Sequence, residues 1–320
     1  MKLNFTHLFI LGAAFVLMTQ CKKEKANEPD ATPTSGGTTT TDNTLADIFT
    51  HQGSQPQTTT IPVTASQNLS VAGVTVSVPV NGFVTATGGS VTGSVDILLK
   101  AVLTKKDIIL TGAPGNSNGK LIATKGCVKV NATQNGQVLR MVPGSPVHVH
   151  VPAGTNPPAQ GMKKWYTASV STTDTSKYWR ISADTNNIPL VMDTTTMNYY
   201  YDVALDSLSW LNCGYVWDTT SAKTSVTINV DTTFTSANCA VYISLDNTMA
   251  VGALYELTPH TYMITNIPIG KTVTFVAIAV INGQYYSKFL PATITANYTQ
   301  TFNLQSTTLT QIQSALTILP

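Results

Sequence analysis

Two histidines stand two residues apart in an alternating stretch, His148 and His150 between Val147, Val149 and Val151. On a strand this spacing places both imidazoles on one face, and with the valines facing inward that face is the outward one. Two imidazoles can share a metal ion, but a site needs at least one further ligand. No nearby carboxylate is evident, so we predict two surface histidines and no metal site.

Aromatic residues are concentrated in residues 153–220, which hold all four tryptophans and half of the tyrosines. Exposed rings flanked by Asn, Asp and Thr would form a platform on which the apolar face of a sugar can stack. Such rings are equally the normal filling of β-sandwich cores and domain seams, and we favour that interpretation. The candidates for ligand binding are Trp165, Trp179, Trp210, Trp217 and Tyr200.

Carboxylates for hydrolytic chemistry would come from the same region, where Asp193, Asp202 and Asp206 lie close in sequence. Glycosidases canonically use two carboxylates. However, Asp followed by Ser or Thr commonly forms a local turn. The chain contains no Gly-x-Ser-x-Gly, no glycine-rich phosphate loop and no His-Glu-x-x-His. We therefore predict no catalytic residues and no cofactor, with a hydrolase built on these aspartates as an alternative.

Three cysteines follow Cys21, namely Cys127, Cys213 and Cys239, an odd number that cannot all pair within one chain. Cys213 and Cys239 could form one disulfide if their strands are adjacent. The alternative, which we favour, is three buried thiols that act as small apolar residues. No Cys-x-x-Cys or His–Cys cluster indicates a zinc site.

The first 21 residues have the organisation of an export signal. Met1 and Lys2 are followed by an apolar stretch that is too short to span a bilayer as a mature helix. Cys21 comes directly after this stretch, and the arrangement resembles the lipobox of bacterial lipoproteins. The resemblance implies that Cys21 becomes the lipid-modified first residue, which anchors the chain to the outer membrane on its periplasmic or outer side. Met18 and Gln20 depart from the strict Leu-Ala-Gly-Cys form, as is familiar among Bacteroidota. The alternative is an ordinary secretory signal.

Composition limits the remaining function classes. Only 11% of the 320 residues are charged and the net charge is +2, so there is no electrostatic footprint for nucleic acid. No second apolar stretch reaches a spanning length, so the lipid on Cys21 would be the only membrane attachment. Residues 21–45 are polar and rich in Thr, Pro and Gly, which is typical of a flexible tether.

Alternation of apolar and polar residues predicts strands in most of the remaining chain, for example at 74–80 and 95–101. Asn135-Gly136 predicts a hairpin turn, and the apolar stretch 272–281 predicts a central strand covered on both faces. A helical turn at 45–49 and a helix after Thr308 are expected, with little room for helices elsewhere in the first domain. The predicted division is a signal at 1–20, a tether at 21–45, a β-domain at 46–152, an aromatic-rich β region at 153–220, and a β-sandwich with a short terminal helix at 221–320.

Spaced motifs at 74–84, 91–95, 116–121 and 130–139 together resemble a domain of uncharacterised Bacteroidota envelope lipoproteins. The first part also resembles a ZU5-type β-domain, and 221–320 resembles an immunoglobulin or transthyretin sandwich. The stretch 209–214 resembles the Gly-Trp-x-Asn-x-Asp motif that follows the first domain in the same lipoproteins. Ser209 and Gly214 replace its Gly and Asp, so a role that depends on the Asp is not carried over.

These features predict an all-β fold of two or three antiparallel sandwich-like domains behind the signal and the tether. The expected function is that of a non-catalytic, lipid-anchored envelope protein with a structural or binding role. Its expected partners are the membrane, through Cys21, and a glycan or an envelope protein. A carbohydrate-binding accessory lipoprotein is the first alternative, and an envelope hydrolase is the second.

Overall fold

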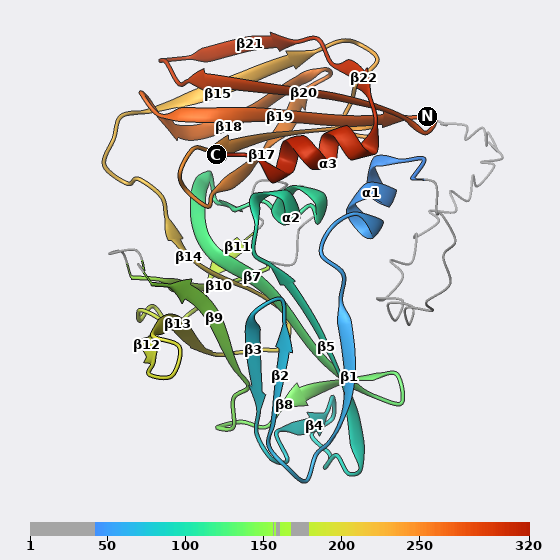
Figure 1. The fold of residues 1–320 in the computed structure, drawn as a ribbon, viewed down its shortest axis with the longest axis vertical. Helices are drawn as coiled ribbons and strands as arrows, with labels where there is room; N and C mark the ends of the chain where they lie inside the picture. Colours follow the sequence, from blue (N-terminus) through green and yellow to red (C-terminus); the bar gives the residue numbers. More distant parts are fainter. Residues whose placement is uncertain (1–41, 156, 158–160, 168–178) are drawn as a thin grey trace, which may run out of the picture. The chain divides into compact units, whose positions relative to one another are not determined.

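Alternating apolar residues build three β-sheets in the computed structural model, which describes residues 42–155, 157, 161–167 and 179–320 (Figure 1). Strands account for 54% and helices for 8% of the described residues, so the predicted all-β fold is confirmed. Within the described residues, the sheets form sandwich-like arrangements and are antiparallel, apart from a parallel pairing between β15 (Lys223–Val230) and β21 (Tyr298–Phe302). The predicted signal and most of the predicted tether lie outside the described residues.

The first sheet has nine strands, and its longest, β7, pairs with β5 on one side and β14 on the other. Asn135 and Gly136 both have positive φ and join β7 to β8 in the predicted hairpin turn. The path of the sheet is β1 (Gln57–Pro62), β5 (Ser94–Val102), β7 (Lys120–Gln134), β14 (Trp210–Val216), β10 (Lys163–Thr167) and β11 (Trp179–Ile181), with β4 (Phe83–Thr85), β6 (Asn116–Ser117) and β8 (Gln137–Met141) attached to it.

The second sheet has five strands and shares one hydrophobic core with the first. Alternate residues such as Val76 and Val149 meet Ile97 and Val128 of the first sheet in this core, all of them buried. The order of strands is β12 (Leu190–Asp193), β13 (Asn198–Ala204), β9 (His148–Gly154), β3 (Val74–Val78) and β2 (Gln67–Val71). The strands of residues 153–220 are divided between the first two sheets. Whether the predicted ranges are separate domains stays a prediction.

The third sheet has eight strands and encloses the second hydrophobic core. Its strand β19 is buried on both faces, as predicted, because Phe275 points into this core and Val276 points into a third cluster on the other side. The order of strands is β21 (Tyr298–Phe302), β15 (Lys223–Val230), β18 (Thr261–Pro268), β17 (Val251–Thr258), β16 (Cys239–Leu245), β19 (Thr272–Ile281), β20 (Gln284–Thr293) and β22 (Gln305–Thr307).

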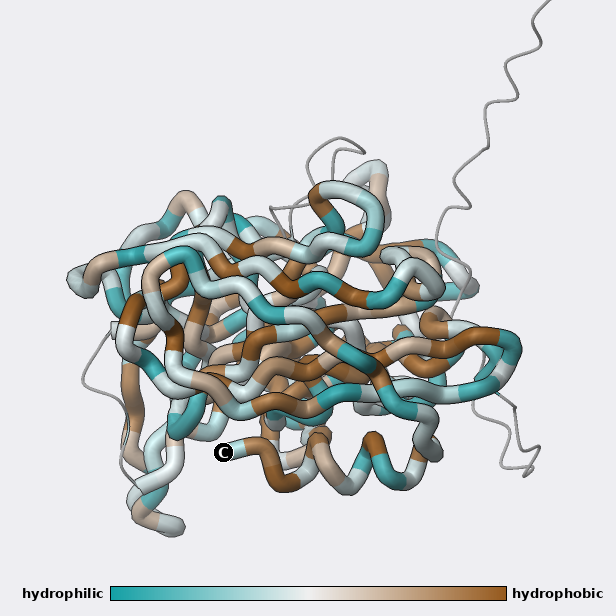
Figure 2. Tube along the Cα trace, turned by 90° about the horizontal axis from the view of Figure 1, so that it is seen from above, coloured by the Kyte–Doolittle hydropathy of each residue, from teal (hydrophilic) through white to brown (hydrophobic). Residues whose placement is uncertain are grey.

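Three short helices, α1 (Leu45–His51), α2 (Lys105–Leu110) and α3 (Leu309–Thr317), contribute apolar residues to the third cluster, which covers the outer face of β19. The cap of α3 is Thr308, as predicted, and its hydroxyl accepts a hydrogen bond from the Gln311 amide. Figure 2 shows the apolar residues that recur along the strands and along this helix. Helix α2 lies where no helix is predicted. In the described part of the chain, no helix is long and apolar enough to cross a membrane.

Candidate functional site

The paired histidines lie on β9 beside a carboxylate that their local sequence does not predict. The register of β9 and β13 sets His150 opposite Asp202. His148 Nδ1 lies 2.8 Å from Asp202 Oδ1, and His150 Nε2 lies 3.5 Å from the same oxygen. The prediction that no carboxylate is near is therefore wrong, because a cross-strand neighbour more than fifty positions away is invisible to local spacing. In the part of the chain that the structure describes, no group of three or more His, Cys, Asp or Glu side chains is arranged to hold a metal.

The histidine–aspartate cluster opens into a pocket of about 310 Å³, which His148, Asp202, Lys164, Asp184 and the loop at 186–189 line. Lys164 Nζ donates to Asp206 at 2.7 Å and lies 3.0 Å from a carboxylate oxygen of Asp184. Burial disfavours the charged ammonium, but the hydrogen bonds to the two carboxylates outweigh it and raise the pKa of Lys164 above its usual value. Carboxylates outnumber cations around this pocket.

Tyr200 belongs to the same cluster. It sits on β13, and its ring centre lies 4.6 Å from that of His150. Burial is the main cause of a lowered pKa at His150, and the charge of Asp202 offsets it only in part. The ring of Tyr200 is half-buried in this contact, so it acts first as a packing partner of His150.

The three aspartates of the predicted hydrolase alternative have separate partners. Asp193 accepts hydrogen bonds from the Thr195 amide and the Thr196 hydroxyl, which is the local turn that the sequence predicts. Asp202 contacts the histidines, and Asp206 holds Lys164. Of the three, only Asp202 lines the histidine pocket.

Two of the candidate tryptophans are buried core residues. Trp165 is 5% exposed and Trp179 is 1% exposed, and both belong to the third hydrophobic cluster. Their indole N–H groups donate to the backbone oxygens of Gly214 and Pro114, at 3.0 and 2.8 Å. They border a hollow of about 550 Å³, but too little of either ring is exposed to stack on a sugar. For these two residues the core interpretation is correct.

Trp210 is half-buried on the outward face of the first sheet. It stands opposite Lys129 of β7, which stands in turn opposite Lys100 of β5. Part of its ring packs against the third hydrophobic cluster. It lines neither the histidine pocket nor the hollow beside Trp165 and Trp179.

Trp217 is the candidate that combines partial exposure with a pocket of polar groups. It follows the end of β14, where its amide donates to the Leu121 oxygen at 2.8 Å. Because side chains alternate along an extended segment, Tyr215 and Trp217 point to the same face of it. Both pack partly against the second core. They line a pocket of about 380 Å³ together with Val216, residues 218–221 and Lys271. This set is called the Trp217 pocket below.

One lining residue of the Trp217 pocket, Asp218, carries an ionised carboxylate. Asp218 accepts hydrogen bonds from the backbone and the hydroxyl of Ser221, and its oxygens lie 3.2 Å from Lys271 Nζ and 3.4 Å from Lys223 Nζ. The Ser221 hydrogen bonds and then the two ammonium groups hold the pKa of Asp218 well below its usual range. Lys271 Nζ also lies 5.7 Å from the centre of the Trp217 ring, within reach of a cation–π contact. The sequence does not indicate that Lys271 contacts Trp217, because the two residues are 54 positions apart.

The disulfide that the sequence leaves open is absent. Cys127, Cys213 and Cys239 are free and buried, as the preferred prediction states. Cys213 stands opposite Gly126 in the first sheet and Cys239 stands opposite Ala279 in the third, so their strands are not adjacent. Burial raises the pKa of Cys127 and of Cys239 to about 12, which leaves little thiolate for chemistry near neutral pH.

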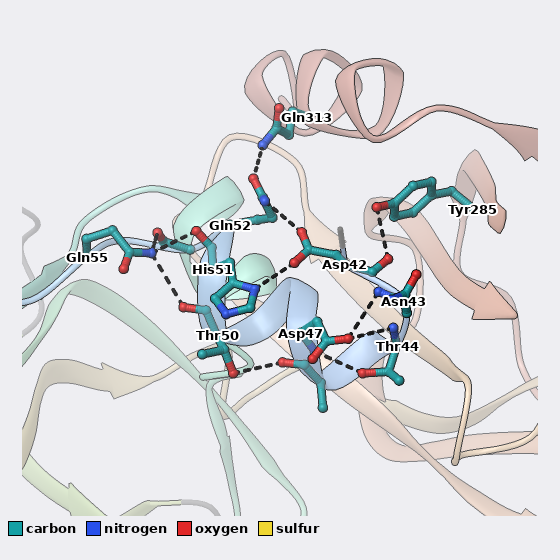
Figure 3. A network of polar contacts seen from close by, with 12 residues as sticks. Asp42, Asn43, Thr44, Asp47, Thr50, His51, Gln52, Gln55, Tyr285 and Gln313 are labelled. Carbon is teal, nitrogen blue, oxygen red and sulfur yellow. Dashed lines mark hydrogen bonds and ion pairs between the residues drawn. The ribbon is translucent and has the colours of Figure 1, made fainter. Parts of the chain in front are cut away.

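A polar network fixes the first described residues to the rest of the fold (Figure 3). Asp42 is 1% exposed, its carboxylate lies 2.6 Å from His51 Nδ1, and it accepts a hydrogen bond from Gln52 Nε2 at 2.7 Å. Tyr285 on β20 donates to the Asp42 backbone oxygen, and Gln313 on α3 donates to Gln52. Residues 42–44, which the sequence analysis assigns to the tether, therefore belong to the folded body.

We expect Asp42→Ala to lower the free energy of unfolding by about 1–3 kcal/mol, because the variant leaves the polar groups of His51 and Gln52 without their shared acceptor. Urea unfolding of the full chain measures the difference. The control is Asp231→Ala, which removes an exposed carboxylate from a turn. Equal stability of the two variants would show that the network contributes nothing.

Comparison with known proteins adds no family, since no family model and no curated protein matches this chain. The structure therefore defines the protein only by its fold, which is all-β with sandwich-like sheets.

Proposed function

We propose that this chain is a non-catalytic, lipid-anchored protein of the cell envelope with a structural or binding role. The observation that carries the proposal is the sequence of residues 1–21, in which a positive start and a short apolar stretch lead directly to Cys21. Acylation of Cys21 would anchor the chain in the outer membrane, with the folded body in the periplasm or at the cell surface.

The attachment of the body at Asp42 supports this role. A protein held by a lipid transmits any pull through the residues that join its anchor to its fold. Here the joining residues are bonded to α1 and β20, and through Gln52 to α3. The polar network thus joins the first described residues to three elements of the fold. This arrangement suits a body that must remain folded while it holds a partner.

The anchor has a direct test. Wild-type protein is expected to incorporate labelled palmitate and to sediment with the outer membrane, whereas Cys21→Ala should lose both properties. Cys127→Ala is the matched control, because it removes a thiol that is buried in the fold. Labelling and sedimentation that survive Cys21→Ala would refute the anchor.

A carbohydrate-binding accessory role is the second candidate, and the Trp217 pocket is the observation that favours it. An aromatic ring beside hydroxyl, carboxylate and ammonium groups is a common setting for binding a small polar ligand. A glycan array with the full chain tests this candidate. Binding that is unchanged in Trp217→Ala would locate the sugar site elsewhere.

A further inference from the structure

We propose that the Trp217 pocket binds a sugar unit that carries a carboxylate group, that is, a uronate residue of an acidic glycan. The inference rests on the carbohydrate-binding candidate above and names the class of ligand. Three features of the pocket carry it, namely its aromatic wall, its charge and its hydroxyl groups.

The aromatic wall consists of Tyr215 and Trp217, both half-buried. Both rings pack partly against the second core, and Tyr215 also packs against the first, so the packing restricts their motion without ligand. Burial raises the pKa of Tyr215, so its hydroxyl stays neutral near pH 7. A rigid ring that is partly exposed can pack against the apolar C–H groups of a sugar at a low cost in entropy.

The charge of the pocket favours an anion. One carboxylate, Asp218, is paired with two ammonium groups, Lys223 and Lys271, so the local sum is one positive charge. The Asp218 side chain is only 10% exposed and its oxygens are occupied by several donors. The side chain of Lys271 is 41% exposed and lines the pocket. An ammonium has three donors, so Lys271 can bond a ligand carboxylate while it keeps Asp218.

Hydroxyl groups complete the pocket. Thr219 and Thr220 are exposed on its rim. A threonine hydroxyl can both donate and accept, so it can bond the hydroxyl groups of a sugar ring. The volume of about 380 Å³ lies within the range of small-molecule pockets, about 300–1,000 Å³.

The histidine pocket offers the opposite charge. Its lining includes Asp184 and Asp202, with Asp206 bonded to Lys164 behind them. Three carboxylates against one ammonium disfavour an anionic sugar there. A uronate should therefore bind more tightly to the Trp217 pocket than to the histidine pocket.

The test measures binding of matched acidic and neutral trisaccharides to the full chain by isothermal titration calorimetry. Each pair consists of one trisaccharide of a uronate and one of the corresponding neutral sugar. The three pairs are built from galacturonate and galactose, glucuronate and glucose, and mannuronate and mannose. At least one acidic member should bind about tenfold more tightly than its neutral partner. This preference should decrease when NaCl is raised from about 0.1 M to about 1 M, because the screening length falls from about 10 Å to about 3 Å.

Variants assign the contacts. Lys271→Gln should remove about tenfold of the affinity for the acidic member and little of that for its neutral partner. Lys288→Gln, which removes a charge on β20 outside the pocket, should change neither. Trp217→Phe keeps an aromatic ring and should retain most binding, whereas Trp217→Ala should lose it. Thermal unfolding of each variant shows whether the fold is intact.

The outcomes distinguish failure of the uronate inference from failure of the carbohydrate role. Equal binding of acidic and neutral members, with loss in Trp217→Ala, would overturn the uronate inference and leave the carbohydrate role standing. Absence of binding by every trisaccharide would overturn both. An acidic preference that persists in Lys271→Gln would overturn the assignment to this pocket. The lipid anchor is tested independently through Cys21.

Discussion

Asn212→Asp is expected to lower the free energy of unfolding by about 3–5 kcal/mol at pH 7, because it places an unpaired charge in the core. Asn212 is fully buried on β14, and neither polar atom of its side chain has a hydrogen-bond partner within the described part of the chain. Leu211 and Cys213 point into the first core, so Asn212 points to the opposite face of the sheet, beside Cys127 and Trp165. An ionised carboxylate there would face Cys127 and Trp165, which belong to the third hydrophobic cluster.

The effect should depend on pH in a defined direction. Burial raises the pKa of a carboxyl in the folded state above its unfolded value of about 3.9. Below that pH the carboxyl is protonated in both states and the ionisation penalty is absent. Above it, the penalty grows by about 1.4 kcal/mol for each pH unit, up to the pKa of the folded state. Urea unfolding of wild type and variant from pH 4 to pH 8 measures this slope.

Asn131→Asp is the matched control for this prediction. Asn131 lies four residues along β7 from Cys127, on the same face of the sheet, but its side chain is half-exposed. Its replacement should cost less than about 1 kcal/mol at every pH, as is usual for surface substitutions. A pH-independent difference between wild type and Asn212→Asp would contradict the assignment of Asn212 to a dry interior.

Gly214 occupies a position at which this fold leaves no room for a side chain. A Cβ atom at this position would lie 2.6 Å from the Ala123 oxygen and 3.1 Å from Asn212 Oδ1. A residue with a Cβ therefore has no room here, where β14 is irregular against β7 between Cys213 and Gly214. The sequence shows the glycine, but only the strand register shows why a larger residue does not fit.

Local sequence patterns correctly predicted the features that depend on residues close together in the chain. The strands around Val76 and Ile97, the turn at Asn135 and the cap at Thr308 depend on residues a few positions apart. Helix α2 could have been found from the same kind of pattern. Its cap Thr104 accepts a hydrogen bond from the amide of Asp107, a recognisable helix start inside a region otherwise rich in strands.

Contacts between distant strands could not be predicted in this way. The pairing of His150 with Asp202 depends on the register of β9 and β13, and the contact of Lys271 with Trp217 depends on where the β18–β19 turn meets the end of β14. Composition showed that aromatic rings were numerous in residues 153–220. It could not show that Trp179 is buried while Trp217 lines a pocket, because burial is a property of the assembled sheets.

Trp179→Ala is expected to cost about 3–5 kcal/mol of unfolding free energy, in the range for large aromatic truncations in a core. The Trp179 side chain is among the largest fully buried ones described, and its removal leaves a cavity in the third hydrophobic cluster. It also leaves the Pro114 oxygen without the indole donor that now lies 2.8 Å away. Trp179→Phe separates the two terms, because it restores most of the packing and should recover more than half of the loss. Chemical unfolding of the full chain measures both variants.

Trp217→Ala provides the contrast, since its ring is half-exposed and packs only partly against the second core. Its loss should cost less than about 2 kcal/mol, because less apolar area returns to water. The two Ala variants should therefore differ in what they lose. Trp179→Ala should mainly lower the free energy of unfolding, and Trp217→Ala should mainly remove sugar binding. A Trp179→Ala variant that unfolds like wild type but loses sugar binding would reverse these assignments, and would mean that the Trp179 ring is exposed in solution.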